Sequence, residues 1–402
     1  MRILHLTTEF PPVIYGGLGT AVGGLVTASV RARMAVKVLL VGETGLGGYG
    51  QPISAEQVTT DQEERAADPA GATIVPVSWY DAQEVGVRLV KQWQPDVVHL
   101  HAFWLWPVAR AIQEGTGTPL VYTVHSLDRA EYELGQGPPE CLTQWEMQAA
   151  AITTADRVIA LSRNEKELLI QYCPGVSDRV RIVGNGIADN CKAHGARREN
   201  GRSEQLQVLY IGRFVERKGI GDLLAAIPLV LARAPASRFV LIGGHRHCSG
   251  AEMERRWLPP ALSPYRSQIS FMGWLAPDEA EEWYERADIL VVPSWYEPFG
   301  MVILEGMLHG LPIVASAIGG PAEILEHEQT GLLFPPRDVE ALAGALLQFV
   351  ENPAQRRDIG TAAVEEVHRE WLWPRIVEKM RCVYHEIMSL KHPPAMSGLR
   401  TS

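Results

Sequence analysis

Residues 289–316 have the sequence ILVVPSWYEPFGMVILEGMLHGLPIVAS, and this segment decides the fold class. A short apolar, β-branched run at 289–292 leads through a proline-flanked loop into an apolar helical stretch at 301–308, and a second apolar run follows at 313–315. Strands that are apolar on both faces are typical of a parallel sheet covered by helices on both sides. The segment therefore predicts a strand–helix–strand unit of an α/β protein.

The same alternation continues along the chain on both sides of this unit. Further strands are expected at 2–7, 36–41, 73–77, 97–101, 120–125, 157–160, 181–183, 208–211, 239–242, 269–272 and 331–334. A polar stretch near residues 188–205 separates the two sets and has the composition of a linker. The pattern predicts two Rossmann-like domains that face each other across a cleft, with the boundaries 1–188, 189–205 and 206–373.

The composition excludes several classes of protein. A chain of 402 residues with 46% hydrophobic and 21% charged residues is long enough for two or three domains and too apolar to be disordered. The net charge, 37 − 47 = −10, argues against nucleic acid as the main partner. Neither a signal-peptide pattern nor an apolar run long enough for a membrane span is present, and the five scattered cysteines lack metal-ligand spacing. We therefore expect a reduced, cytoplasmic protein without an integral membrane segment.

Two glycines, Gly16 and Gly17, lie between the first expected strand and a helix expected from about residue 20. Ligands of open α/β sheets bind beyond the carboxyl ends of the strands, where glycine lets backbone N–H groups approach a phosphate. Alternatively, the glycines only form a tight turn with positive φ. A dinucleotide-binding fingerprint is disfavoured, because Val22 stands where that motif requires a small residue.

Two cations, Arg213 and Lys218, follow the first strand of the second half in GRFVERKG. Arginine and lysine in one loop at a strand end suit a diphosphate. The alternative is a solvated basic loop with no ligand.

Two carboxylates flank the start of the helix at 301–308: Glu297 precedes it, and Glu305 falls in its second turn. A carboxylate accepts two hydroxyl hydrogen bonds at once, which suits the vicinal diols of a sugar or ribose. The first backbone N–H groups of the helix are free to bind an anion. They belong to Phe299, Gly300, Met301 and Val302. Alternatively, both carboxylates only complement the helix dipole.

Histidines end two neighbouring strands: His99 and His101 end one, and His125 ends the next. A histidine at a strand end can bond a substrate hydroxyl or carry a proton, but it is more often a hydrogen-bonded core residue. The chain lacks both the Asp-x-Asp spacing that often holds a divalent ion on a sugar diphosphate and the lysine motif of a P-loop. Cations and helix ends are therefore expected to bind any phosphate, with no metal and no cofactor.

In this order, these motifs resemble those of the family 4 retaining GT-B glycosyltransferases, which include glycogen synthases and sucrose-phosphate synthases. The most specific element is Glu297-x7-Glu305, followed by the pair Gly319-Gly320. PPVIYGGLG, the pair Asn185-Gly186 and GRFVERKG support it. The resemblance covers nearly the whole chain and implies the GT-B fold. It also implies that a last helix, at 374–390, crosses back to the first domain, which a helical apolar stripe in this segment permits.

The resemblance implies a role for each motif residue. Glu305 would hold the donor ribose, Glu297 would contact the transferred sugar, and His125 would lie near that sugar. Arg213 and Lys218 would neutralise the diphosphate of the leaving group. Donor sugar hydroxyls and phosphates would also meet the backbone of Gly16, Gly17, Phe299, Gly300, Met301 and Val302.

The implied activity is metal-independent, retaining transfer of a hexosyl group, glucose-type favoured, from a UDP-, ADP- or GDP-linked sugar. The acceptor would be a hydroxyl of a carbohydrate or glycoconjugate, and a homo-oligomer is compatible with this function. Ile14 and Tyr15 stand where glycogen synthases usually carry Lys-Thr, and the missing lysine argues against polyglucan synthesis from ADP-glucose. Loops at 43–72 and 128–146 are expected to be individual to this chain. Four aromatic residues could stack on an acceptor or belong to the core: Trp104, Trp106, Tyr132 and Trp145.

Alternative functions are a GT-B nucleotide-sugar epimerase or phosphorylase, and a non-catalytic nucleotide-sugar-binding protein. Retention follows from the resemblance alone. No carboxylate nucleophile of the glycosidase kind is recognisable, and so we expect front-face attack, with the departing phosphate oxygen taking the acceptor's proton.

Overall fold

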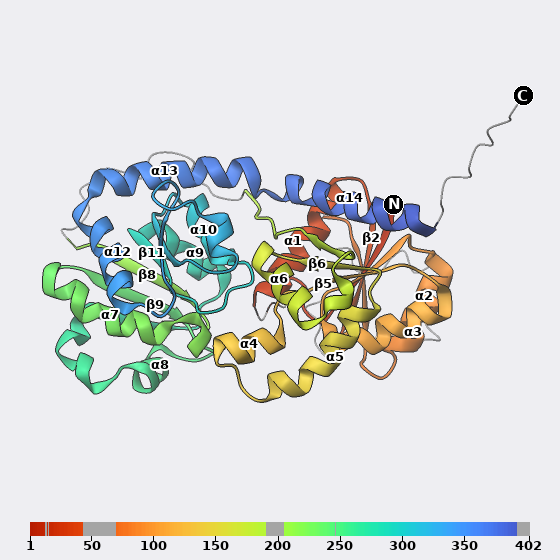
Figure 1. Ribbon diagram of the computed structural model, residues 1–402, viewed down its shortest axis with the longest axis horizontal. Coiled ribbons are helices and arrows are strands. Elements are labelled where there is room, and N and C mark those ends of the chain that lie inside the picture. The colour runs from red at the N-terminus through yellow and green to blue at the C-terminus, as the bar shows by residue number, and fades with distance from the viewer. Residues whose placement is uncertain (13, 15, 43–69, 190–204, 246, 392–402) are drawn as a thin grey trace, which may run out of the picture.

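The computed structural model describes residues 1–12, 14, 16–42, 70–189, 205–245 and 247–391, which form two α/β lobes (Figure 1). The first lobe contains a parallel sheet in the order β3-β2-β1-β4-β5-β6-β7. Its strands are β1 (Arg2–Thr7), β2 (Ala35–Val41), β3 (Thr73–Val77), β4 (Val97–Leu100), β5 (Leu120–Thr123), β6 (Arg157–Ala160) and β7 (Val180–Ile182).

The second lobe contains a parallel sheet in the order β10-β9-β8-β11-β12-β13. Its strands are β8 (Gln207–Gly212), β9 (Arg238–Gly243), β10 (Ile269–Gly273), β11 (Ile289–Val292), β12 (Ile313–Ser316) and β13 (Leu332–Phe334). Every strand expected from the sequence is present, with ends shifted by at most two residues, so the prediction of two parallel α/β units is confirmed.

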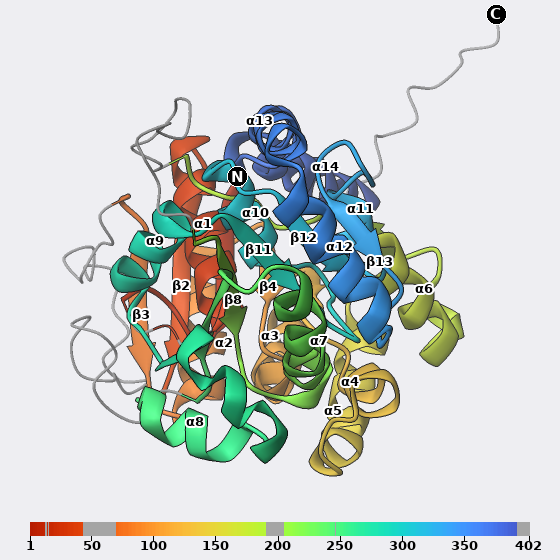
Figure 2. The same cartoon turned by 90° about the vertical axis from the view of Figure 1, so that its left-hand side faces the viewer.

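Helices lie on both faces of each sheet, which explains why the strands are apolar throughout. Along β2, Val38 and Leu40 belong to one core cluster, and Leu39 and Val41 belong to the cluster on the opposite face. The same alternation separates Leu209 from Tyr210 in β8, and Figure 2 shows the second lobe in front with its helices around the sheet.

The α-helices are α1 (Gly17–Arg31), α2 (Ala82–Trp93), α3 (Trp106–Thr116), α4 (Asp128–Gly135), α5 (Glu140–Thr154), α6 (Arg163–Tyr172), α7 (Ile220–Arg233), α8 (Gly250–Trp257), α9 (Pro277–Arg286), α10 (Met301–Leu308), α11 (Pro321–Ile324), α12 (Val339–Glu351), α13 (Pro353–Glu370) and α14 (Trp373–Lys391).

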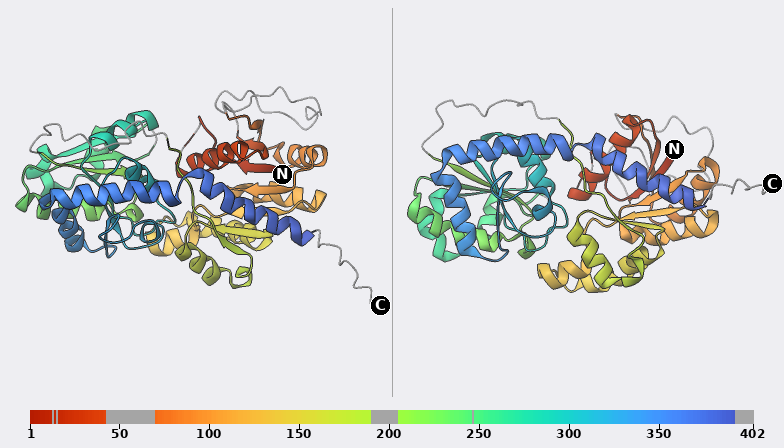
Figure 3. Two further views of the ribbon diagram at one scale, coloured as in Figure 1. Left: turned by 90° about the horizontal axis from the view of Figure 1, so that it is seen from above. Right: turned by 45° about the horizontal axis from the view of Figure 1, so that its top comes forward.

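The last helix, α14, crosses from the second lobe back to the first, as expected. Figure 3 shows α13 lying along the second lobe and α14 continuing over the first. Trp373, Ile376 and Tyr384 of α14 are buried in one core cluster with Val22 and Leu25 of α1. This packing ties the two lobes together through a continuous apolar contact. No helix among the described residues combines the length and the apolar character that crossing a membrane requires.

Two local expectations were wrong. Helix α1 begins at Gly17 rather than near residue 20, so Gly17 belongs to its first turn. The segment 128–146 is not a loop, because α4 and the start of α5 occupy most of it around a break at residues 136–139. Residues 43–69 and 190–204, which include most of the expected surface excursion and linker, lie outside the described residues. The domain boundaries therefore stay predictions.

Candidate active site

The two lobes meet at the carboxyl ends of their strands, where side chains from one bond to the other. The Nε of Arg217, in the 3₁₀ turn η5 (Glu216–Lys218), donates to Oε1 of Glu131 on α4 at 2.8 Å. The hydroxyl of Tyr296, after β11, lies 3.0 Å from Oε1 of Glu165 on α6 and accepts a bond from the N–H of Leu127. Burial raises the pKa of Glu165 to about 8, although its bond to Tyr296 opposes the rise. These contacts hold the loops that carry the predicted site residues against each other.

The predicted site residues Lys218 and Glu297 form a largely buried ion pair at this junction, with side chains 20% and 8% exposed. Ser294 Oγ is a second donor to Oε2 of Glu297 at 3.2 Å. Burial alone would raise the pKa of Glu297, but the Lys218 and Arg217 cations outweigh it and hold that pKa below its ordinary value. Burial also lowers the pKa of Lys218, assisted by Arg217 and opposed by Glu297. The sequence predicted both residues as donor contacts, but not their pairing.

Arg213 and Arg217 differ in exposure although both follow β8. The Arg213 side chain is 56% exposed, and its nearest guanidinium nitrogen is 3.9 Å from Glu131. The Arg217 side chain is only 6% exposed and is held by Glu131. The Arg213 side chain is therefore available to bind an anion. Arg217 instead links the lobes through Glu131, and its positive charge acts on Lys218 and Glu297.

The start of α10 is built by close backbone packing. Gly300 is the N-cap, with φ +103°, and Phe299 before it is buried. A Cβ at Gly320 would lie 1.9 Å from the carbonyl oxygen of Phe299, so only glycine allows this approach. The N–H of Gly320 donates to the carbonyl oxygen of Glu297 at 3.0 Å. The glycine pair at 319–320 thus fixes the loop that carries Glu297 into the helix.

Glu305 is held by a residue that the sequence analysis missed. The hydroxyl of Tyr284 on α9 donates to Oε2 of Glu305 at 2.5 Å, and its ring stacks on His309 with 5.2 Å between centroids. Burial raises the pKa of Glu305, and the bond from Tyr284 opposes the rise. One carboxylate oxygen is thereby oriented, which leaves the other for a ligand. The sequence signal for Tyr284 is weak, because it lies 21 residues from Glu305 on a different helix.

Replacing Tyr284 with phenylalanine is expected to raise the donor KM by about three- to tenfold, the scale of one ordinary hydrogen bond, because the bond that is lost orients Glu305 and does not contact the donor itself. Without the hydroxyl, the pKa of Glu305 rises further, so a smaller fraction is ionised at a given pH. The acid limb of kcat/KM should therefore move to higher pH, while the stacking on His309 is kept. A pH profile that is unchanged from the wild type would contradict this role for Tyr284.

Gly16 and Gly17, at the start of α1, face open space. Among the described residues, leaving out its chain neighbours and its own helix backbone, a Cβ built on either glycine has no heavy atom within 4 Å, and Gly16 has an extended φ of −176°. The alternative that this pair serves a turn with positive φ is therefore wrong. In contrast, a Cβ at Gly24 would lie 2.2 Å from the ring of Trp373. The first pair leaves room for a ligand, and Gly24 is required for packing.

Replacing Gly17 with alanine is expected to raise the donor KM by about tenfold without loss of stability, because the new methyl group occupies the space that a phosphate would approach. Gly24→Ala is the matched control, in which the clash with Trp373 lowers the melting temperature. A normal donor KM in Gly17→Ala would remove this glycine from the site.

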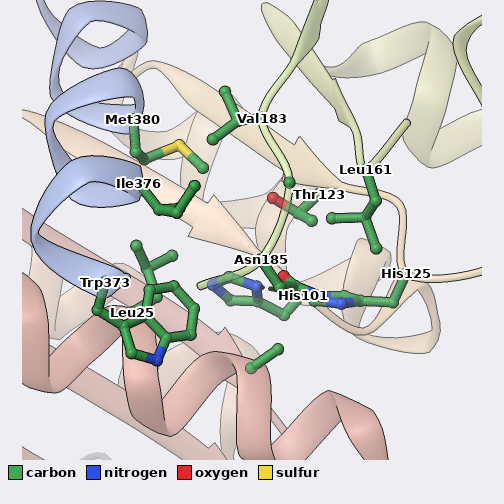
Figure 4. Close-up of a pocket in the computed structure, with 12 residues that line it drawn as sticks. Leu25, His101, Thr123, His125, Leu161, Val183, Asn185, Trp373, Ile376 and Met380 are labelled. Atoms are coloured by element: carbon green, nitrogen blue, oxygen red, sulfur yellow. Dashed lines mark hydrogen bonds between the residues drawn. The ribbon is translucent and has the colours of Figure 1, made fainter. Parts of the chain in front are cut away.

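His125 lies at the end of β5 beside a small pocket shown in Figure 4. Its Nε2 is 3.2 Å from Nδ1 of His101, and Leu25, Trp373 and Met380 line the far side of the pocket. Burial lowers the pKa of His125 to about 4, so the ring is neutral near pH 7. His99 and His101 are buried, hydrogen-bonded core residues, which was the alternative to a substrate contact.

The candidate acceptor aromatics divide into two groups. Trp106 and Trp145 pack against the core of the first lobe. Trp104 and Tyr132 are 40% and 37% exposed. The exposed pair is therefore more accessible to a ligand than the partly buried pair.

Comparison with known proteins agrees with this architecture. The family model described as "Glycosyltransferase Family 4" matches residues 15–190, and the model described as "Glycosyl transferases group 1" matches residues 205–352. The chain is 30% identical over 401 residues to a glycogen synthase of Mycobacterium tuberculosis, covering 96% of this chain and 94% of the relative. It is 29% identical over 411 residues to an alpha-maltose-1-phosphate synthase of Mycolicibacterium smegmatis, covering 96% and 100%.

Solved structures share the fold at low sequence identity. A sucrose-phosphate synthase from Thermosynechococcus elongatus superposes with a TM-score of 0.73 at 24% identity, covering 97% of this chain and 100% of that structure. HepE of Anabaena, in complex with UDP and glucose, has a TM-score of 0.73 at 20% identity, covering 96% and 99%. With two facing parallel-sheet lobes and family matches over both, the chain belongs to the family 4 glycosyltransferases of GT-B fold, enzymes that use nucleotide sugars.

Proposed function

We propose that this glycosyltransferase moves a hexosyl group, with glucose-type sugars favoured, from a nucleotide-diphosphate sugar to a hydroxyl of a carbohydrate or glycoconjugate, with retention at the anomeric carbon. The observation that carries the proposal is the buried Lys218–Glu297 pair, with exposed Arg213 nearby and the start of α10 following Glu297. A hydroxyl-binding carboxylate beside diphosphate-binding cations suits a sugar diphosphate.

The relatives support the donor class. Starch synthase IV of Arabidopsis thaliana is described as bound to ADP and acarbose, and HepE as bound to UDP-glucose. The glycogen synthase and the alpha-maltose-1-phosphate synthase, by their names, form glucose-containing products. UDP-, ADP- and GDP-linked hexoses are therefore the donors to test first.

In the proposed reaction, the bond between the anomeric carbon and the diphosphate oxygen breaks as the acceptor oxygen attacks the same face. The acceptor's proton passes to the departing phosphate oxygen. Lys218 and Arg213 stabilise the negative charge that develops there. Glu297 Oε2 already receives bonds from Lys218 and Ser294, which lowers its nucleophilicity and favours direct transfer over a covalent intermediate.

The proposed reaction needs no metal ion and no further cofactor, since the cations of the η5 loop would balance the diphosphate. Activity should then be the same in EDTA and in added Mg²⁺. A strict requirement for a divalent ion would contradict this part of the proposal.

The first test is nucleotide release from UDP-, ADP-, GDP- and TDP-sugars, with and without a pooled acceptor extract. Acceptor-stimulated release from one donor would support the transferase and identify its donor. Conversion of a nucleotide sugar without acceptor would point to an epimerase, and the absence of release by the folded protein would point to a binding protein. The anomeric proton coupling at the new glycosidic bond, compared with that of the donor sugar, then tests retention.

A further inference from the structure

A chain of hydrogen-bonded histidines leads from His125 into the core of the first lobe. Nε2 of His125 is 3.2 Å from Nδ1 of His101, and Nε2 of His101 is 2.8 Å from Nδ1 of His5. His5 lies in β1, whereas His101 follows β4 and His125 follows β5, the next strands of the sheet. His5 and His101 are 0% and 3% exposed. Neither His5 nor His101 has a role in the function described above.

All members of the chain are neutral near pH 7. Burial lowers the pKa of His5 to about 3 and that of His125 to about 4. Burial, with the neighbouring histidines, holds the pKa of His101 well below its ordinary value. Each ring therefore carries one N–H, and a neutral ring both donates and accepts one bond. The hydrogen bonds along the three histidines must therefore all be donated in the same direction, either from His5 towards His125 or from His125 towards His5.

The inner end of the chain decides the direction. Nε2 of His5 is buried and has no hydrogen-bond partner among the residues that the structure describes. A buried N–H without an acceptor is rare in proteins and costly, so this nitrogen carries the bare lone pair. His5 then holds its proton on Nδ1 and donates to His101, and His101 donates from its own Nδ1 to Nε2 of His125. The proton of His125 is left on Nδ1.

A metal site is the competing interpretation, because His5, His99 and His101 place ligand atoms within 4.8 Å of one another. Both ring nitrogens of His101 are already used in the chain, and both of His99 are bonded, to Tyr384 and Thr123 at 2.7 Å. The rings of His99 and His101 also lie against each other, with centroids 4.1 Å apart and an angle of 31° between their planes. A bound ion would have to break these bonds, so the hydrogen-bonded chain is favoured.

We propose that His5 and His101 are positioning residues that hold His125 in the Nδ1–H tautomer, so that it presents a fixed hydrogen-bond donor to the transferred sugar. The inference rests on the proposed function and on the resemblance to family 4, which implies that His125 lies near that sugar. A neutral ring with this fixed proton binds an oxygen atom of the sugar and does not act as a general acid.

The test reads the tautomer directly in the full chain labelled with ¹⁵N-histidine. Long-range ¹H–¹⁵N spectra distinguish protonated from bare ring nitrogens, and comparison with His125→Asn assigns the signals of His125. We expect a protonated Nδ1 and a bare Nε2. The reverse pattern in the wild type would overturn the proposal, as would bound zinc whose removal by EDTA shifts the His5 and His101 signals.

Three variants separate positioning from packing. His101→Leu removes the donor to His125 and should convert His125 largely to the Nε2–H form, with about a tenfold loss in kcat/KM, the scale of one hydrogen bond. His101→Asn should retain the Nδ1–H form and most activity, because the amide nitrogen can occupy the place of the ring Nδ1. His99 is equally buried but does not belong to the series of hydrogen-bonded histidines. His99→Leu should therefore lower stability without changing the tautomer of His125.

The outcomes also distinguish this inference from the proposed function. A wild-type Nδ1–H signal in a protein without transferase activity would remove the proposed function and leave the tautomer assignment standing. Full transferase activity with an Nε2–H His125, or a His101→Leu variant whose tautomer is unchanged, would overturn the inference alone.

Discussion

Replacing Lys218 with methionine is expected to lower kcat by about 10²–10³-fold, the usual effect of removing one preorganised group that stabilises developing charge. Methionine keeps most of the length and the apolar stem of lysine, so the substitution mainly removes the positive charge that would face the diphosphate. The donor KM should rise less than kcat falls, because the leaving group gains negative charge only in the transition state. Steady-state kinetics with the identified donor measure both quantities.

The single substitution also leaves Glu297 buried without its principal partner. Breaking a buried ion pair in this way costs about 3–5 kcal/mol, so part of the protein could unfold. The double variant Lys218→Met/Glu297→Gln removes both charges and should recover most of that stability in urea unfolding, while its activity remains low. Recovery of activity together with stability would show that the pair is structural and would contradict the role of Lys218 at the diphosphate.

Replacing Gly320 with alanine is expected to reduce kcat/KM by at least about 10²-fold and to lower the melting temperature. The added Cβ would lie 1.9 Å from the carbonyl oxygen and 2.3 Å from the Cα of Phe299, and backbone atoms cannot move aside as a flexible side chain can. The loop from Glu297 to the start of α10 must therefore shift, and a displacement of about 1 Å in a positioned group costs this much in rate.

Gly344→Ala, in the interior of α12, is the matched control. Among the described residues outside its own stretch of helix backbone, a Cβ at Gly344 meets no atom within 4 Å, so alanine should stabilise the helix by up to about 1 kcal/mol with normal activity. If Gly320→Ala retained normal kcat/KM and melting temperature, the close packing of this loop would not be what positions Glu297.

Patterns within short segments determined much of this protein. The apolar, β-branched runs predicted every described strand, because a strand buried on both faces must be apolar throughout. Glycines and charged residues at strand ends pointed to the cleft, since parallel strands end at a common edge. The apolar stripe of α14 was visible from its spacing, although its packing on α1 was implied only by the resemblance to family 4. The role of each predicted donor contact remains a prediction.

The helices within 128–146 could not be predicted in the same way. Their sequence is mostly polar and is interrupted by QGPP at 136–139, so it contains no continuous apolar stripe that would predict a helix. Helices α4 and α5 have few buried residues, such as Ala130 and Ile152. Which of their residues are buried is decided only when the core of the first lobe is assembled. The bond from Arg217 to Glu131 then orients α4 toward the second lobe.

The sequence alone thus determined the fold class, the sheet edges at which the two lobes meet and the set of charged residues that lie there, because all three depend on local spacing. Only the tertiary structure decided which of these groups meet. Lys218 and Glu297 are 79 residues apart, Arg217 and Glu131 are 86 apart, and His5 and His101 are 96 apart. Pairing over such separations follows from strand order and lobe docking, and it sets the pKa values and orientations through burial and neighbouring charge.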